Sequence, residues 1–308
     1  MAIPMSQVLT QILVILLYVI VGFVAGKVKV INPEQRKYLT GLCSNLILPF
    51  TILSASSQQM DGETMTNFGL ATAVMFGLLG GTLVLMLLYH RVRHTPAPLR
   101  AATTGLITFP NCTFLGLPLC QALFGDIAVL YNASAILAFN VYFFTVQYTL
   151  FTGKGFRLKN LATPPVISTA MLIVMLLLGL HFPTPVQTIC SNIGAMISPL
   201  SLIIIGVMMS ESDLMAMLKE KRAYVVTLLR NLVIPFAAIL LLTLIPMDLT
   251  NRLCVLVFIA TPCGTLTSIY AIRENMEPEL CARTVLLSTV CFAGTLPVII
   301  LLGQLLLK

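Results

Sequence analysis

The chain has 308 residues, of which 58% are hydrophobic and only 9% are charged, with a formal net charge of +7. Soluble domains carry about 25% charged residues, so this composition excludes an ordinary soluble protein. Apolar stretches of about 20 residues with at most one charge recur along the chain, and that length crosses the core of a bilayer. We therefore expect an all-α polytopic membrane protein. We attribute its positive charge to membrane orientation and not to nucleic-acid binding.

Ten apolar segments are separated by short charged or turn-rich segments, which predicts ten transmembrane helices. The first five predicted spans cover residues 7–26, 37–57, 64–89, 99–124 and 127–152. The second five cover residues 163–181, 185–209, 222–246, 250–273 and 278–307. The chain therefore divides into a first half at 1–153, a short cytosolic linker at 154–162 and a second half at 163–308.

The positions of lysine and arginine test this count, because cytosolic loops are enriched in both residues. With the N-terminus outside the cytosol, two of the 18 fall on the outer side, Arg252 and Lys308, and Arg230 lies within a span. The other fifteen fall on the cytosolic side: Lys27, Lys29, Arg36, Lys37, Arg91, Arg93, Arg100, Lys154, Arg157, Lys159, Lys219, Lys221, Arg222, Arg273 and Arg283. This separation predicts ten spans with both termini outside the cytosol.

The acidic residues and cysteines limit the chemistry of the membrane interior. All eleven acidic residues fall in predicted loops or at span ends, so the sequence lacks the buried carboxylate that many ion-coupled pumps use as a proton relay. The eight cysteines form no Cys-x-x-Cys pair and lie almost entirely within apolar segments. We expect them to act as small hydrophobic residues, without a disulfide framework, a metal site or a cofactor.

The two halves of the chain resemble each other in sequence. The segment LCSNLILPFTIL at 42–53 parallels ICSNIGAMISPLSLII at 189–204, and ITFPNCT at 107–113 parallels IATPCGT at 259–265. Chance similarity between apolar segments is the alternative, but two matches in the same order favour a repeat. Because each half has five spans, the second half is inverted relative to the first. Secondary transporters are commonly built in this way.

Spans 4 and 9 are each interrupted at the centre by proline and small polar residues. Proline breaks the helical hydrogen bonds, and in a membrane the freed backbone groups survive only within protein or beside a wet cavity. Matched breaks indicate a transporter binding site where half-helix N-termini suit an anion, whereas a simple proline kink is the alternative for one span alone. The predicted substrate-binding residues are Pro110, Asn111, Cys112 and Thr113 in span 4, and Pro262, Cys263, Gly264 and Thr265 in span 9.

Three polar residues in other spans are further candidates for this site. Arg230 is either a counter-ion, to a substrate carboxylate or to backbone carbonyls at the broken helices, or a side chain that snorkels to the cytosolic interface. Asn132 and Asn140 are eight residues apart and lie on roughly one face of span 5. They either line a cavity beside span 4 or form hydrogen bonds between helices.

Two features of span 3 predict structure and not chemistry. Gly77, Gly80 and Gly81 indicate close contact with a neighbouring helix. His90 and His94 at the cytosolic end have a spacing that suits a metal ion. No acid or cysteine joins them, so we expect them to be interfacial.

The chain resembles the auxin efflux carrier family, which includes the plant PIN auxin transporters and bacterial permeases for small organic acids. The resemblance covers essentially the whole chain. It rests on NLILPFTIL in span 2, FPNCTFLGLPL in span 4, SPLSLIIIG in span 7, RNLVIP in span 8, and TPCGTLTSIYAI with ELCARTVLLST in spans 9 and 10. The plant carriers have a longer Asn-Pro-Asn type motif in span 4 where this chain has Phe-Pro-Asn. Many of them also have a long hydrophilic central loop that this chain lacks.

The resemblance implies a secondary transporter of small organic anions, such as auxin-like, malate-like or malonate-like acids, without enzymatic activity. It implies that spans 1, 2, 6 and 7 form a scaffold with a homodimer contact, and that spans 3–5 and 8–10 form a transport domain. The broken spans would cross at mid-membrane, and the transport domain would slide like an elevator. The implied location is the inner membrane of a bacterial cell, in contact with lipid.

Other functions remain as alternatives. A sodium-coupled symporter of the bile-acid type is the first, because backbone carbonyls at the breaks can hold an ion. A membrane-embedded enzyme is less favoured, since the sequence has no acidic metal-binding cluster and no nucleophile with its base. A channel is also disfavoured, because channels usually form their pore on a symmetry axis between subunits.

Overall fold

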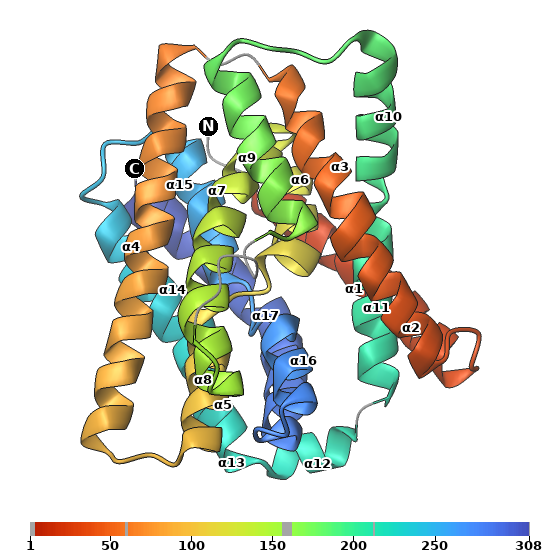
Figure 1. Ribbon diagram of the computed structural model, residues 1–308, viewed down its shortest axis with the longest axis vertical. Helices are drawn as coiled ribbons and strands as arrows, with labels where there is room; N and C mark the ends of the chain where they lie inside the picture. The colour runs from red at the N-terminus through yellow and green to blue at the C-terminus, as the bar shows by residue number, and fades with distance from the viewer. Residues whose placement is uncertain (1–3, 59–60, 156–161, 212, 308) are drawn as a thin grey trace.

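The protein is an elongated bundle of helices (Figure 1). The computed structural model describes residues 4–58, 61–155, 162–211 and 213–307. In the first half the α-helices are α1 (Met5–Lys27), α2 (Pro33–Leu42), α3 (Leu48–Ser54), α4 (Gly62–Val92), α5 (Ala97–Thr108), α6 (Leu117–Phe124), α7 (Ile127–Tyr142) and α8 (Tyr148–Thr152). In the second half they are α9 (Pro164–Leu177), α10 (Thr184–Ala195), α11 (Ile197–Glu211), α12 (Leu214–Lys219), α13 (Lys221–Leu228), α14 (Ile234–Leu242), α15 (Leu249–Ala260), α16 (Thr265–Arg273) and α17 (Pro278–Leu306).

Seven helical stretches in the described parts of the chain are long and apolar enough to cross a membrane. They are Met5–Lys27, Pro33–Ser57, Gly62–Val92, Ile127–Thr152, Thr184–Glu211, Lys221–Leu242 and Pro278–Leu306. The other three predicted spans contain shorter apolar helices, Cys112–Phe124, Pro164–Leu177 and Leu249–Ala260. The expected all-helical membrane class is therefore confirmed. The short helix α12, between α11 and α13, was not predicted.

Single π-helical turns interrupt several of the spans. Three of them end two residues before a proline: η1 (Cys43–Ile47) before Pro49, η3 (Cys112–Gly116) before Pro118 and η6 (Leu229–Val233) before Pro235. Proline has no N–H to donate to the carbonyl four residues earlier, and its ring crowds that carbonyl. A wider π turn at this point relieves the crowding and leaves the helix continuous. A fourth, η4 (Phe143–Gln147), has no such proline.

The closest helix packing joins α1 to α11. A Cβ atom added at Gly22 would collide with the backbone of Ile203, and one added at Gly206 would collide with the backbone of α1. These glycines therefore allow the two helices to approach with their backbones almost in contact. A similar approach joins α3 to α10, where the hydroxyl of Thr51 donates a 3.1 Å hydrogen bond to the carbonyl of Gly194.

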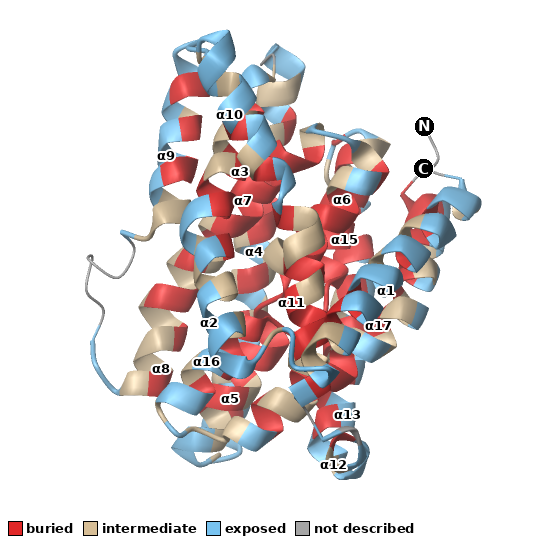
Figure 2. Ribbon diagram, turned by 90° about the vertical axis from the view of Figure 1, so that its right-hand side faces the viewer, coloured by how far each residue is buried: buried red, intermediate tan, exposed pale blue. Residues whose placement is uncertain are grey.

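Burial increases toward the centre of the bundle, as Figure 2 shows. Within the most apolar 18-residue stretch of each span, 67% of the residues are buried for the span formed by α7 and α8, but only 17% for α1. In α4, the predicted close contact is found at Gly80, which lies against the ring of Tyr142. It is wrong for Gly77 and Gly81, which have no neighbouring atom within 4 Å of an added Cβ. Gly77 and Gly81 therefore lie on a side of α4 that faces away from the described core, whereas Gly80 faces α7.

Candidate functional site

Both predicted interruptions are present. Helix α5 ends at Thr108, and helical structure resumes with η3 at Cys112. Helix α15 ends at Ala260, and α16 begins at Thr265. The prolines in each gap cannot continue a helix and instead hold the backbone extended. Each span is therefore two half-helices joined by a short extended segment.

The two extended segments pair with each other as one isolated antiparallel bridge between Pro110 and Cys263. The N–H of Asn111 donates to the carbonyl of Pro262, and the N–H of Gly264 donates to the carbonyl of Phe109, each at 2.8 Å. The two donors of the bridge are Asn111 and Gly264, so Pro110 and Pro262, which have no N–H, are not required to donate. The breaks therefore cross, as predicted, and satisfy part of each other's backbone.

Arg230 satisfies further backbone groups at the same crossing. It lies on η6 and is only 2% exposed. Its Nε donates to the carbonyl of Thr261 at 3.0 Å and its Nη1 donates to the carbonyl of Ile107 at 3.2 Å, while Nη2 donates to the carbonyl of Ile259. These carbonyls lie at the C-terminal ends of α5 and α15, where the helix dipole is negative. The snorkelling alternative is therefore wrong, and the alternative that Arg230 binds backbone carbonyls at the broken helices is confirmed.

A second support for the crossing comes from α17 and was not predicted. The N–H of Cys263 points away from the bridge and donates to the hydroxyl of Ser288 at 3.2 Å. The side-chain amide of Asn231 in turn donates to the carbonyl of Ser288 at 2.7 Å. On the other side, the hydroxyl of Ser201 in α11 donates to the carbonyl of Phe114 in η3 at 2.8 Å. Side chains of three other spans thus hold the broken segments.

A cavity of about 230 Å³ lies against the crossing. The first turns of η3 and α16 both line it, so the positive ends of two half-helices are at its wall. Six of the eight residues predicted at the breaks line this cavity, namely Pro110, Asn111, Cys112, Thr113, Gly264 and Thr265. Ser44 and Asn45 from η1 complete its polar lining together with Asn140 and Thr163. Pro262 and Cys263 do not line it.

A second cavity, of about 830 Å³, lies between α2 and α11 on one side and α16 and α17 on the other. Asn111 and Thr265 line both cavities and therefore stand between them. The side-chain nitrogen of Asn111 is buried without a hydrogen-bond partner among the described residues. An unpaired buried donor costs about 1–3 kcal/mol, so this nitrogen is available to a ligand acceptor.

The larger cavity carries several charged side chains. Arg36, Lys37 and Arg273 line it, and Glu211 is the one acid among its described lining residues. Arg36 and Glu211 form an ion pair at 3.0 Å, which joins α2 to α11. Arg273 is paired with Glu274, which does not line the cavity, at 3.2 Å. Lys37 has no ion pair within the described chain, so the cavity lining keeps an excess of positive charge. Such a cavity concentrates anions by long-range attraction.

The asparagines of span 5 occupy different environments. Asn140 lines the smaller cavity, although its side-chain nitrogen donates to the carbonyl of Ile136 at 2.8 Å. Asn132 is fully buried, lines neither of the two cavities, and has no hydrogen-bond partner among the described residues for either amide atom. Asn45 also lines the smaller cavity, and the repeated Cys-Ser-Asn segment is the one sequence feature that singles it out.

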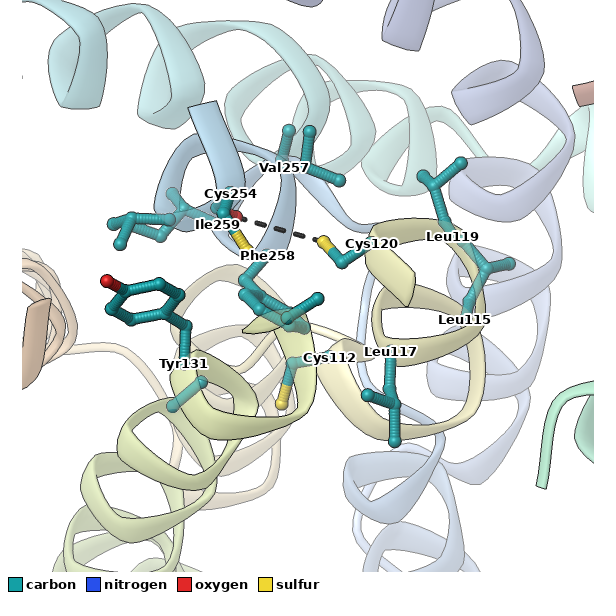
Figure 3. Packing of buried hydrophobic residues seen from close by; sticks show 14 of the residues in the cluster. Cys112, Leu115, Leu117, Leu119, Cys120, Tyr131, Cys254, Val257, Phe258 and Ile259 are labelled. Atoms are coloured by element: carbon teal, nitrogen blue, oxygen red, sulfur yellow. Dashed lines mark hydrogen bonds between the residues drawn. The ribbon is translucent and has the colours of Figure 1, made fainter. Parts of the chain in front are cut away.

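The wall behind the crossing is apolar and tightly packed. Figure 3 shows Cys120 of α6 facing Cys254 of α15, where the thiol of Cys120 donates a 3.8 Å hydrogen bond to the carbonyl of Cys254. Phe109 makes edge-to-face contacts with neighbouring aromatic rings of span 5 at 5.1 Å. No group of three or more His, Cys, Asp or Glu side chains in the described part of the chain could hold a metal ion.

A family model described as membrane transport protein matches the chain twice, over residues 7–160 and 148–300. Together these matches cover almost the whole sequence. The chain belongs to this family, the auxin efflux carriers. No curated protein matches the chain. The paired breaks and their two cavities are therefore the candidate site of a membrane transporter in the auxin efflux carrier family.

Proposed function

We propose that this auxin efflux carrier family member is a secondary transporter of small organic anions that binds its substrate at the paired breaks. The observation that carries the proposal is the position of Asn111, whose unpaired buried side-chain nitrogen lies between the two cavities. A carboxylate placed beside Asn111 and Thr265 would accept a hydrogen bond from the side-chain nitrogen of Asn111, which lacks a partner among the described residues. It would accept another from the hydroxyl of Thr265, which can rotate. The substrate class is a carboxylate of auxin-like, malate-like or malonate-like size.

The electrostatics of the crossing favour an anion. Arg230 occupies the negative C-terminal ends of α5 and α15, so their dipoles are neutralised away from the cavity. The N-terminal turns of η3 and α16 are at the cavity wall, and no acidic side chain is among its described lining residues. Helix N-termini bind anions through free N–H groups and the positive end of the dipole. The substrate site therefore needs no dedicated cation of its own.

The size of the cavity also favours a small acid. Its volume of about 230 Å³ lies below the roughly 300–1,000 Å³ of pockets for drug-sized ligands. A bile acid would not fit without rearrangement, whereas a short mono- or dicarboxylate would. This argues for the organic-acid substrate over the bile-acid alternative, although it leaves sodium coupling as a separate question for experiment.

We further propose ten spans in two inverted five-helix repeats, with the broken fourth and ninth spans crossing at mid-membrane. In Figure 1, α1 begins and α17 ends in the upper part of the bundle, whereas the α4–α5 connection, α12 and the start of α13 lie at the lower end. The basic residues Arg91 and Arg93 belong to this end through the end of α4 and the α4–α5 connection, and Lys219, Lys221 and Arg222 through α12 and α13. Arg157 and Lys159, also assigned to the cytosol, lie outside the described residues. Lys308, assigned to the outer side, also lies outside them.

Cysteine labelling tests this topology, since only Cys291 among the native cysteines is not buried. A cysteine introduced at Asp61 should react with an impermeant reagent added from outside, and one introduced at Lys154 should not. The opposite pattern would reject both the orientation and the inverted repeat.

The transport movement that we propose is elevator-like, between a scaffold of α1–α3 and α9–α11 and a transport domain of α4–α8 and α13–α17. Packing within each group supports this division, since α1 contacts α11 and α3 contacts α9 and α10, while α4 contacts α7 and α17 contacts α13, α15 and α16. The larger cavity lies between the two groups. We place the homodimer contact on the scaffold and the protein in the inner membrane of a bacterial cell.

The decisive experiment is transport by the purified chain in liposomes. Uptake of labelled mono- and dicarboxylates should be saturable, and the same acids should raise the melting temperature of the detergent-solubilised protein by mass action. Sodium and proton gradients applied separately identify the coupling ion, and sodium-dependent bile-acid uptake would favour the alternative. Absence of both uptake and stabilisation across the acid panel would reject the proposed substrate class.

A further inference from the structure

A third cavity lies away from the paired breaks, at the turn between α4 and α5 in the lower end of the bundle (Figure 1). Its volume is about 570 Å³. The side chains that line it come from the end of α4, the following turn, the start of α5, and α8. They are Leu87, His90, Arg91, His94, Thr95, Arg100 and Leu150.

The lining of this cavity is basic and lacks a counter-charge. Arg91 and Arg100 face it with His94, and none of its lining residues is acidic. The ion pairs found within the described chain use other arginines, namely Arg36, Arg273 and Arg283. The Nε atom of Arg100 is buried and has no hydrogen-bond partner among the described residues. Two guanidinium groups therefore face this space without an acidic lining residue, and the Nε of one of them has no partner among the described residues.

The framework of the cavity is built by a buried histidine. His90 is 4% exposed, and its Nδ1 and Nε2 each lie 3.0 Å from a threonine hydroxyl, that of Thr95 in the turn and that of Thr103 in α5. His90 thus joins the turn to α5, on which Arg100 lies. The neighbouring His94 adopts a left-handed conformation with a φ of 48°, which lets the chain reverse directly into α5.

The depth of the cavity in the membrane identifies the ligand chemistry. Helix α4 has 31 residues, which at 1.5 Å per residue is about 46 Å, well beyond the roughly 30 Å of a bilayer core. Its last turn, which carries Arg91, therefore lies at the level of lipid headgroups. Arginine binds phosphate oxygens through paired, charge-assisted hydrogen bonds.

We propose that this cavity is a phosphate site, which holds the phosphate of an anionic lipid headgroup or a free phosphate group between Arg91 and Arg100. The bound phosphate neutralises the two arginines and joins the end of α4 to the start of α5. The site is separate from the substrate site, and its existence does not depend on the substrate proposed above.

The test uses the full chain purified in detergent, with three matched variants. Arg91→Gln and Arg100→Gln each remove one guanidinium from the cavity. Arg93→Gln removes the same charge from an exposed residue of the same turn that does not line the cavity. Native mass spectrometry measures retention of phosphatidic acid, with phosphatidylcholine as the zwitterionic reference. A thermal-shift titration with inorganic phosphate measures binding of the free ion.

We expect the native chain to retain phosphatidic acid in preference to phosphatidylcholine. Arg91→Gln and Arg100→Gln should each weaken retention about tenfold, as for loss of a charge-assisted hydrogen bond, while Arg93→Gln should retain the lipid. Stabilisation by inorganic phosphate without lipid retention, lost in the same two variants, would assign the site to a free phosphate. If the Arg100→Gln variant does not fold, the Arg91→Gln variant alone tests the proposal, because Arg91 is an exposed residue. Equal loss in Arg93→Gln, or no binding of either probe, would overturn the proposal.

Discussion

The backbone N–H of Asn111 donates a 2.8 Å hydrogen bond to the carbonyl oxygen of Pro262, across the point where two broken helices cross. Residues 151 positions apart in sequence thus share one backbone interaction. Neither break could persist alone in a membrane, because each leaves backbone groups that lipid cannot satisfy. The pairing explains why both halves of the chain carry a proline at the corresponding place, and it positions the side chain of Asn111 at the cavity wall.

Our first prediction concerns the Asn111 side chain. Asn111→Ala keeps the backbone hydrogen bond to Pro262 and removes only the amide donor. Loss of one hydrogen bond to a charged ligand costs about 1.5–3 kcal/mol, so anion affinity should fall about tenfold or more. Titration calorimetry or a thermal-shift titration with the best substrate acid measures the change. Expression and melting temperature without ligand should be close to those of the native chain.

Asn132→Ala is the matched control for that substitution. It also removes a buried, unpartnered asparagine amide, but from a residue that lines neither of the two cavities. Anion affinity should therefore be retained. If Asn132→Ala lost affinity while Asn111→Ala kept it, recognition would have to be assigned to the face of α7 and not to the crossing.

The second prediction concerns Arg230 as a structural residue. Its guanidinium donates to three carbonyls at the ends of α5 and α15, and a planar fork is needed to reach all three. Arg230→Gln would leave several buried carbonyls without donors and should destabilise the protein by about 3 kcal/mol or more. Arg230→Lys keeps the charge but not the fork and should give an intermediate loss.

Melting temperatures measured without substrate test this prediction. They should decrease from the native chain to Arg230→Lys and further to Arg230→Gln. A stable Gln variant whose only defect is weaker anion binding would contradict the structural role. It would instead favour the other alternative from the sequence, in which Arg230 is a counter-ion for the substrate carboxylate.

Much of this architecture was predictable because membrane constraints are simple. Apolar length placed the predicted spans on helical segments of the structure, and only the short helix α12 among the described α-helices lay outside them. The prolines at 110 and 262 revealed the breaks, because a proline flanked by small polar residues cannot be hidden in lipid. The repeat then indicated that the two breaks belong together. These are local or periodic signals, which a single sequence carries.

The supporting contacts were not predictable, because they depend on how spans rotate against one another. The sequence left Arg230 with three alternatives: a substrate carboxylate, backbone carbonyls at the broken helices, or the cytosolic interface. Only the packing of η6 against α15 selects the backbone carbonyls. Ser288 likewise reads as an ordinary polar residue of α17, although it accepts the N–H of Cys263. The π turns escaped prediction because the same segments are consistent with an α-helix that tolerates a proline.

The third prediction tests the packing of α1 against α11. Gly206→Ala adds a methyl group where backbone atoms of α1 already occupy the space. The two helices would have to separate, so we expect a loss of about 1–3 kcal/mol in stability, as for overpacking of a core. Gly77→Ala is the control, since an added Cβ there has no neighbour within 4 Å. It should be neutral or slightly stabilising, because alanine favours a helix over glycine by up to about 1 kcal/mol. Equal melting temperatures for the two variants would contradict the close approach.

The last prediction concerns the route of the anion through the larger cavity. Lys37 lines that cavity and has no ion pair within the described chain, while Arg273 lines it and is paired with Glu274 outside the lining. In the double variant Lys37→Gln/Arg273→Gln, uptake at low substrate concentration should fall several-fold at low ionic strength, because the attraction that concentrates the anion is lost. At about 1 M salt the Debye length is only about 3 Å, so the native and variant rates should converge. Lys219→Gln/Arg222→Gln removes two exposed cations that do not line the cavity and should change uptake little at either salt concentration. An equal decrease in both double variants would mean that the net charge of this face, and not the cavity, attracts the substrate.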